Sequence, residues 1–178
     1  SKLNTTYQLR VIKEEESNHF FGRLKQKLLG KQRELQFVDQ NSNTPVTPQE
    51  MGLGISQYLP ILVSGKLLKN HQILIEQPEL HLHPALQCEI GDEFIRSYHE
   101  NGNEFFIESH SEHLLLRIMK RMRQTANGEL PKDHPLALTP DDVCLLYVDT
   151  IDGNTFLKEL EIDSDGTLLD PWPNGFFE

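Results

Sequence analysis

The sequence predicts an α/β fold in which a mostly parallel sheet is flanked by helices and carries an antiparallel hairpin at its edge. Two short apolar runs, residues 71–76 and 104–108, are each followed by a stretch with helical periodicity. A third run, residues 143–150, leads through a short turn into another alternating segment. Strand, helix, strand, helix, strand and hairpin is the order that such a layer requires.

The N-terminal part predicts two strands joined by a basic segment. Thr6–Glu14 and Glu34–Gln40 have the alternation and the residue types of strands. The stretch between them, Gly22–Gly30, is basic and compatible with a helix. Asn41–Glu50 is rich in Asn, Pro and Thr, so we expect a loop there.

A helix is predicted after this loop. Tyr58–Leu68 is mostly apolar at helical spacing, and Ser56 is placed to cap its start. Pro60 would then fall near the first turn, where its missing N–H costs least. Gly52 and Gly54 precede this helix and leave the backbone conformationally free.

The central part predicts two buried strands and two helices. His71–Glu76 and Glu104–Glu108 are apolar enough for buried strands. Pro84 starts a helix that continues to about Glu100, and Asn101–Asn103 forms a turn after it. The apolar face of this helix is formed by Leu86, Ile90 and Phe94.

Polar residues follow both central strands. Glu76 ends the first, and Glu108, Ser109 and His110 end the second. Because polar groups at the carboxyl ends of such strands collect at one edge, we expect a ligand site there. Ser109 and Glu112 fit a capping box that opens a helix through about Arg123.

The C-terminal part predicts a hairpin and a second turn. Val143–Thr150 is a strand that Asp152–Asn154 turns into an antiparallel partner. Asp163–Gly166 is another turn. The EF-hand pattern is not met, because Gly166 directly follows Asp165, although an acidic D-x-D pair for Mg²⁺ stays possible at this turn.

Composition indicates a soluble globular protein, with 37% hydrophobic and 25% charged residues. The net charge of −10 argues against a chain that wraps nucleic acid along its whole length. No apolar run has the length of a membrane span and no signal peptide opens the sequence, so we expect a cytoplasmic protein. Two isolated thiols, Cys88 and Cys144, fit a reducing compartment.

Positive charge is gathered in two clusters, which favour solvated helix faces but also fit a phosphate-contacting surface. The first cluster contains Arg23, Lys25, Lys27, Lys31 and Arg33, and the second Arg117, Lys120, Arg121 and Arg123.

His81 and His83 form an HxH pattern that would place both rings on one face of an extended segment, as in several metallohydrolases. The pattern is short, and Pro84 and a helix follow at once with no further ligand at close spacing. Neither a G-x-S-x-G elbow nor a phosphate loop G-x-x-x-x-G-K-[ST] occurs in the sequence.

Three segments together resemble the C-terminal half of an ABC-type ATPase head. ILIEQPELHLHP resembles the Walker B strand and D-loop, MGLGISQYLPIL the signature motif, and FFIESHSEHLLLRI the switch-histidine strand and helix. The residue sequences of these segments are similar to those of a bacterial group of AAA-type ATPases. That group is related to overcoming-lysogenization-defect nucleases and to RecF and SMC heads. That group also has a tail matched here by Trp172, Pro173, Gly175, Phe176 and Phe177. The resemblance implies a P-loop-NTPase-like fold.

The resemblance also implies roles around ATP and Mg²⁺. Glu76 would hold the water shell of Mg²⁺. Gln77 stands where many relatives carry the glutamate that activates the attacking water, and an amide orients water without taking its proton. Glu79 would supply the base instead, or serve as a structural residue of the D-loop. His110 would contact the γ-phosphate, or bond to backbone at a helix start.

The signature segment would contact the phosphate held by an opposite subunit, through Gly52, Gly54, Ser56 and Gln57. The usual Ser-Gly-Gly order is not present. His81 and His83 lie in the region that crosses the dimer interface of related heads, so the resemblance implies interface residues rather than metal ligands.

The resemblance divides the chain into three parts. Residues 1–50 would link to an N-terminal lobe, 51–140 would hold the motifs, and 141–178 the hairpin and tail. Since the phosphate loop is missing, that lobe would come from a longer chain or a partner, and this chain alone would bind ATP poorly. The intact protein is expected to be a homodimeric ATPase acting in DNA maintenance or phage defence, with DNA or an effector protein as partner. The alternative is a non-catalytic dimerisation module.

Overall fold

The computed structural model describes residues 7–13, 33–39, 41–47, 50 and 52–172. Contacts divide the chain into two compact units, Ser1–Ser56 and Gln57–Glu178.

The first unit contains a small antiparallel sheet. Its strands are β1 (Tyr7–Lys13), β2 (Arg33–Asp39) and β3 (Pro45–Val46), in the order β1-β2-β3. The two strands predicted here are confirmed, whereas the predicted loop after them contributes β3, in which Val46 pairs with Phe37. The basic stretch expected at residues 22–30 lies outside the described residues.

Helix α2 (Leu53–Leu67) begins earlier than predicted. Gly52, with a φ of +97°, is the left-handed residue from which the chain enters the helix. Ser56 therefore lies inside the first turns and does not cap; its hydroxyl donates to the carbonyl of Gly52 at 3.3 Å. For the same reason Pro60 lies inside the helix and not in its first turn.

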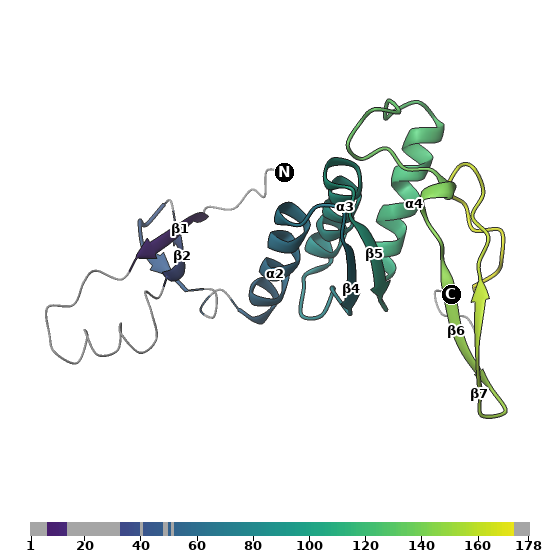
Figure 1. The fold of residues 1–178 in the computed structure, drawn as a ribbon, viewed down its shortest axis with the longest axis horizontal. Helices are drawn as coiled ribbons and strands as arrows, with labels where there is room; N and C mark the ends of the chain where they lie inside the picture. The colour runs from purple at the N-terminus through teal and green to yellow at the C-terminus, as the bar shows by residue number, and fades with distance from the viewer. Residues whose placement is uncertain (1–6, 14–32, 40, 48–49, 51, 173–178) are drawn as a thin grey trace, which may run out of the picture. The chain divides into compact units, whose positions relative to one another are not determined.

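The second unit contains a parallel pair of strands, β4 (Gln72–Glu76) and β5 (Glu104–Glu108), which lie side by side in Figure 1. Both strands were predicted, but as buried, and this is wrong for one face. Leu74 and Phe106, which are register partners, are 77% and 61% exposed. Within the described residues the parallel sheet has only these two strands, so the predicted larger parallel sheet is not observed.

Helix α3 (Pro84–Asn101) packs on the covered face of this pair. The ring centroids of Phe94 and Phe105 are 4.9 Å apart, and Ile90 is fully buried. The apolar face predicted for this helix is thus confirmed. The helix ends at Gly102, a left-handed glycine with a φ of +65° that lies in the segment predicted to turn, Asn101–Asn103.

Asn103 is a buried polar side chain that holds the ends of several elements together. It is 0% exposed. Its amide nitrogen donates to the carbonyl of Leu68 and to the hydroxyl of Ser97, both at 2.9 Å, and its amide oxygen accepts from His71 N–H at 3.0 Å. Ser97 in turn donates to the carbonyl of Gly65 at 2.8 Å, which fixes α2 against α3. These bonds satisfy a group that would be costly to bury alone.

Helix α4 (Glu112–Ala126) packs closely against α3. A Cβ at Gly91 would lie 3.1 Å from a methyl of Leu114, so the glycine allows this approach. The N-cap is Ser111, whose hydroxyl accepts from Leu114 N–H at 3.0 Å. The predicted capping box from Ser109 is therefore wrong, because the Ser109 side chain bonds elsewhere.

The C-terminal segment builds the remaining core and a separate hairpin. A buried cluster joins α3 and α4 to the connection that follows them; its members are Ile95, Met122, Leu136 and Leu138. After a 3-10 turn, η1 (Pro140–Asp142), β6 (Leu146–Ile151) and β7 (Asn154–Glu159) pair antiparallel as predicted. The hairpin forms its own two-stranded sheet, so its expected place at the edge of the parallel sheet is wrong.

The turn predicted at Asp163–Gly166 is confirmed. The N–H of Gly166 donates to the carbonyl of Asp163 at 2.8 Å, and Ile162 and Leu168 form a bridge around the turn. Gly166 is buried with a φ of +76°, and a Cβ there would lie 2.5 Å from the carbonyl oxygen of Met119. The turn therefore sits directly on α4, and a tight turn explains the motif.

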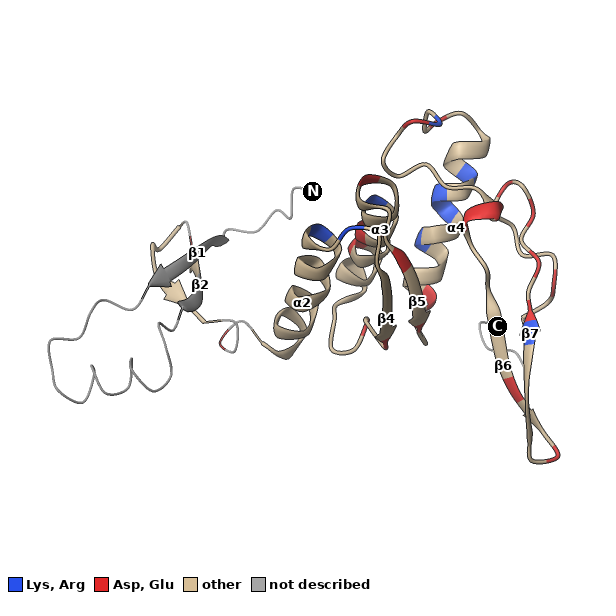
Figure 2. Ribbon diagram, in the orientation of Figure 1, with Lys and Arg blue, Asp and Glu red and all other residues tan. Residues whose placement is uncertain are grey.

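Basic residues recur along α4 (Figure 2). Two of them are not free for phosphate: Arg121 lies 2.6 Å and Arg117 3.9 Å from the buried carboxylate of Asp92 on α3. This half of the predicted phosphate surface is thus partly a structural ion-pair network. No described helix is long and apolar enough to cross a membrane.

Candidate functional site

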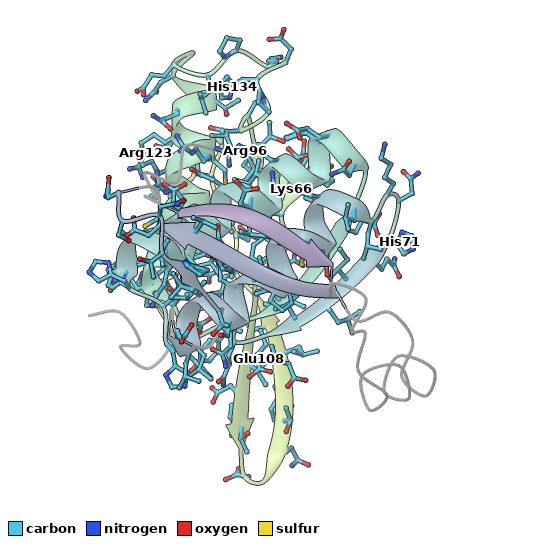
Figure 3. The ribbon with its side chains drawn as sticks, turned by 90° about the vertical axis from the view of Figure 1, so that its left-hand side faces the viewer. Lys66, His71, Arg96, Glu108, Arg123 and His134 are labelled. Atoms are coloured by element: carbon cyan, nitrogen blue, oxygen red, sulfur yellow. The ribbon has the colours of Figure 1, made fainter. Side chains whose placement is uncertain are left out.

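The carboxyl ends of β4 and β5 form the candidate site. Glu76 and Glu108 are the last residues of the two strands and are register partners, which places their backbones about 5 Å apart. Both are exposed, on the same face as Leu74 and Phe106. In the view of Figure 3, Glu108 lies below Lys66. The parallel order thus brings two carboxylates to one edge, as the sequence predicted.

The chain reverses direction directly after β4. The N–H of Gln77 donates to the carbonyl of Glu108 at 2.8 Å, which extends the ladder by one residue. Gln77 then takes a φ of +47°, and the N–H of Leu80 donates to its carbonyl at 3.1 Å. A left-handed conformation is uncommon for a residue other than glycine. It sets the half-buried Gln77 at the start of a tight turn beside Glu76.

His81 and His83 occupy different positions in this turn. His81 is exposed and left-handed, with a φ of +61°. His83 is the N-cap of α3, and its Nδ1 accepts from Ala85 N–H at 3.2 Å. The segment is not extended, so the expectation that both rings share one face is wrong. Among the described residues, no three His, Cys, Asp or Glu side chains are grouped to hold a metal ion.

Glu79 connects the turn to the loop after β5. Its carboxylate accepts two hydrogen bonds, from the Ser109 hydroxyl at 2.9 Å and from the His110 N–H at 2.6 Å. The side chain of His110, the expected phosphate contact, is exposed, and the backbone N–H of this residue takes part in the bridge. The structure therefore brings Glu79 and His110 together, as members of one hydrogen-bonded group.

A second hydrogen-bonded bridge connects the same turn and the same loop through Gln87. The hydroxyl of Ser111 donates to the side-chain oxygen of Gln87 at 2.6 Å, and the Gln87 amide nitrogen donates to the carbonyl of Leu82 at 3.0 Å. Sequence reasoning did not identify Gln87 or Ser111 as members of this group, and it placed Ser109 at this edge but expected its side chain to cap the helix. The available signal was a pair of serines around His110, together with an amide in the first turn of α3.

The segment expected to act as a signature motif lies at the start of α2. Gly52 and Gln57 are exposed, and Gly54 and Ser56 are half-buried. Gly52 is left-handed, as a glycine that opens a helix can be. An exposed helix start of this kind offers backbone N–H groups to an anion.

The edge after β4 and β5 gathers oxygen donors and polar groups of the kinds that a hydrated cation and a phosphate require. The exposed carboxylates of Glu76 and Glu108 are hard oxygen donors, which suit Mg²⁺ bound through water. Gln77 and His110 add groups that can orient water or contact phosphate. Gln77 and His110 belong to turns whose backbone is held by hydrogen bonds, so the fold defines the backbone from which these side chains extend.

Comparison with known proteins gives two matches. Residues 6–117 match a family described as "AAA domain, putative AbiEii toxin, Type IV TA system". Residues 138–178 match a family of proteins of unknown function, DUF3696. No curated protein matches the chain. The first match starts well before Met51, where the resemblance begins, and it spans β1 through most of the candidate site. The chain therefore belongs to this family of AAA domains.

Proposed function

We propose that this chain supplies one half of a Mg-ATP site in an ABC-type AAA ATPase, and that the other half, with the phosphate loop, comes from elsewhere in the protein or from a partner. Membership of the AAA family indicates a nucleotide-binding, ATPase-like function with a P-loop-NTPase-like fold. The observation that carries the proposal is the shared edge at which Glu76, Gln77 and the loop after Glu108 meet.

Glu76 is the proposed magnesium residue. Mg²⁺ keeps several waters and is commonly bound by one or two carboxylates together with substrate phosphates. An exposed carboxylate at a strand end, with that of Glu108 beside it, fits this requirement. When bound, Mg²⁺ neutralises the charge of the phosphates.

Gln77 and His110 are the proposed groups at the γ-phosphate. Gln77 would orient the attacking water, because an amide donates and accepts hydrogen bonds but does not take up the proton. Such a site relies on positioning and charge stabilisation, which account for most of the catalysis in phosphoryl transfer. His110 would contact the phosphate from its exposed loop. Slow hydrolysis follows from the amide at position 77.

The signature residues and His81 are proposed to act across a dimer. In a head-to-tail homodimer, Gly52, Gly54, Ser56 and Gln57 would face the phosphate bound by the opposite subunit, and His81 would lie at the interface. The exposed start of α2 supports this assignment, since an anion is favoured there. The proposed division of the chain into a linking part (1–50), a motif part (51–140) and a C-terminal hairpin part (141–178) rests on the resemblance.

The phosphate-loop half is proposed to cover the exposed face of β4 and β5. This face presents three register-paired rows: Gln72 with Glu104, Leu74 with Phe106, and Glu76 with Glu108. The apolar middle row would be buried by the other half, as both faces of parallel strands usually are. The larger role, a switch in DNA maintenance or phage defence that acts on DNA or an effector protein, rests on the resemblance alone.

Calorimetric titration with Mg-ATP tests the proposal. The chain alone is expected to show no micromolar binding, whereas the protein that includes the phosphate loop binds and hydrolyses ATP. Glu76→Gln, which keeps the shape and removes the charge, should lower hydrolysis at least ~10-fold. Glu129→Gln, an exposed carboxylate elsewhere in the second unit, is the control. Micromolar binding by the chain alone, or full activity of Glu76→Gln, would contradict the proposal.

The rival is a non-catalytic dimerisation module. The amide at position 77 and the exposed apolar row of Leu74 and Phe106 favour it, because both suit a lobe that docks without turnover. In the protein with the phosphate loop, unchanged ATPase rates in both Glu76→Ala and Gln77→Ala would favour this rival.

A further inference from the structure

The carboxylate of Glu79 has both oxygens engaged by the same neighbouring loop. Oε2 accepts the hydroxyl proton of Ser109 at 2.9 Å, and Oε1 accepts the backbone N–H of His110 at 2.6 Å. Glu79 itself lies in the turn after β4, 30 residues earlier in the chain than Ser109. One half-buried side chain therefore joins the ends of two strands.

Both ends of this bridge are fixed in their own segments. On the side of the turn, the carbonyl of Glu79 accepts from Leu82 N–H at 2.9 Å. On the side of the loop, the Ser109 hydroxyl oxygen also accepts from Ser111 N–H at 3.0 Å, and Ser111 caps α4. The hydrogen bonds thus run without a break from the turn, through the carboxylate, to the start of a helix.

The oxygen that faces His110 is unsuited to act as a general base. A base must take up a proton, and a protonated Oε1 would direct its O–H at the His110 N–H, which is also a donor. The backbone N–H cannot turn around to accept, unlike the hydroxyl of Ser109. Proton uptake at that oxygen would therefore break the contact that holds His110.

We infer that Glu79 is a positioning residue: it couples the turn that carries Gln77 to the loop that carries His110, so that the two move as one. The effect on hydrolysis rests on the proposed function, whereas the coupling is a property of this chain. With the coupling in place, a ligand that displaces His110 also displaces Gln77. Gln77, which orients water, and His110, which contacts the phosphate, then keep their positions relative to each other.

The coupling is tested first in the chain itself, without nucleotide, by amide hydrogen exchange. In Glu79→Ala the His110 amide should exchange at least ~10-fold faster, because it loses a charge-assisted hydrogen bond. In Glu79→Gln, whose amide oxygen can still accept from His110 N–H, exchange should stay within ~3-fold of wild type. Ser109→Ala should shift the amide resonance of Leu82 across the bridge. Glu112→Ala, an exposed carboxylate in the first turn of α4, is the control.

Hydrolysis in the protein with the phosphate loop gives the second test. Glu79→Gln should keep kcat within ~3-fold of wild type, while Glu79→Ala should lower it at least ~10-fold. A general base would lose about 10²–10⁴-fold in both variants, since neither side chain accepts a proton. Equal losses in the two variants, or wild-type exchange of His110 in Glu79→Ala, would overturn the inference. A wild-type protein without ATPase activity would overturn the proposed function instead, and the exchange measurements would still decide the coupling.

Discussion

Asp92 on α3 and Arg121 on α4 form a two-pronged salt bridge. Nε of Arg121 lies 2.9 Å from Oδ1 of Asp92, and Nη2 lies 2.6 Å from Oδ2. The Asp92 side chain is only 4% exposed. Its hydrogen bonds raise the pKa of the Arg121 guanidinium. The pair joins the two helices where Gly91 lets them approach.

Removing one partner of this pair should be strongly destabilising. Asp92→Ala leaves the Arg121 guanidinium in a largely buried position without its carboxylate, so the free energy of unfolding should fall by about 3 kcal/mol. Urea unfolding followed by circular dichroism measures this. Arg123→Ala removes an exposed charge from the same helix and should change stability by less than about 0.5 kcal/mol. A loss below about 1 kcal/mol in Asp92→Ala would mean that the pair does not hold the helices together.

Two glycines with the same backbone conformation should tolerate alanine differently. Gly166 has a φ of +76° and Gly153 a φ of +78°. Nothing lies within 4 Å of a Cβ at Gly153, so Gly153→Ala should cost only about 1 kcal/mol, for the left-handed backbone. At Gly166 the Cβ would also lie 2.5 Å from the Met119 carbonyl oxygen, so Gly166→Ala should cost at least about 2 kcal/mol more. Equal losses in urea unfolding would show that the turn does not rest on α4.

Asp142 should make stability depend on pH in the acid range. Burial raises the pKa of Asp142, but hydrogen bonds from Thr139 and Tyr98 outweigh burial and hold it below its ordinary 3.8. A lowered pKa in the folded state stabilises the fold above about pH 4, and this contribution is lost as pH falls through the folded value. Since the residue is exposed, we expect less than about 1 kcal/mol.

The comparison of wild type with Asp142→Asn isolates this contribution. The variant should be less stable at neutral pH, and the difference in unfolding free energy should shrink steadily as pH falls below about 4. Urea titrations at several pH values measure the difference, so that carboxylates common to both proteins cancel. If the difference in unfolding free energy stays constant down to about pH 3, the side-chain shape of Asp142 and not its charge is responsible for the stabilisation.

Gln77→Glu should accelerate ATP hydrolysis if the proposed site is correct. A carboxylate can accept the proton that an amide cannot, so kcat should rise at least ~10-fold in the protein with the phosphate loop. Gln77→Asn keeps an amide and suits a left-handed backbone, so it serves as the control and should not exceed the wild-type rate. A Gln77→Glu rate at or below wild type would show that the side chain at position 77 does not face the attacking water.

The local elements were predictable because each rests on a short-range pattern. Residues 71–76 and 104–108 are apolar and short, and Pro84 and Gly102 bracket a helix with standard end signals. The burial of the strands was not predictable, because an apolar run looks the same whether one face or both are covered.

The composition of the candidate site was less predictable than its location. That Glu76 and Glu108 share an edge follows from parallel strand order alone. The role of Glu79 depends on which loop its side chain meets, and that loop is 30 residues away in sequence. The N-cap was misassigned for a similar reason: Ser109 and Ser111 are equally good caps locally, and the tertiary contact of Ser109 with Glu79 decides between them.

The left-handed backbone at Gln77 also determines which amino acids the position tolerates. β-branched side chains clash in that conformation, so valine, isoleucine and threonine should be depleted in a saturation library even when selection is for folding alone. Glycine, asparagine and unbranched residues should survive. A loss of function in Gln77→Val therefore reflects backbone strain. Only replacements that accept a positive φ test the catalytic role of the side chain.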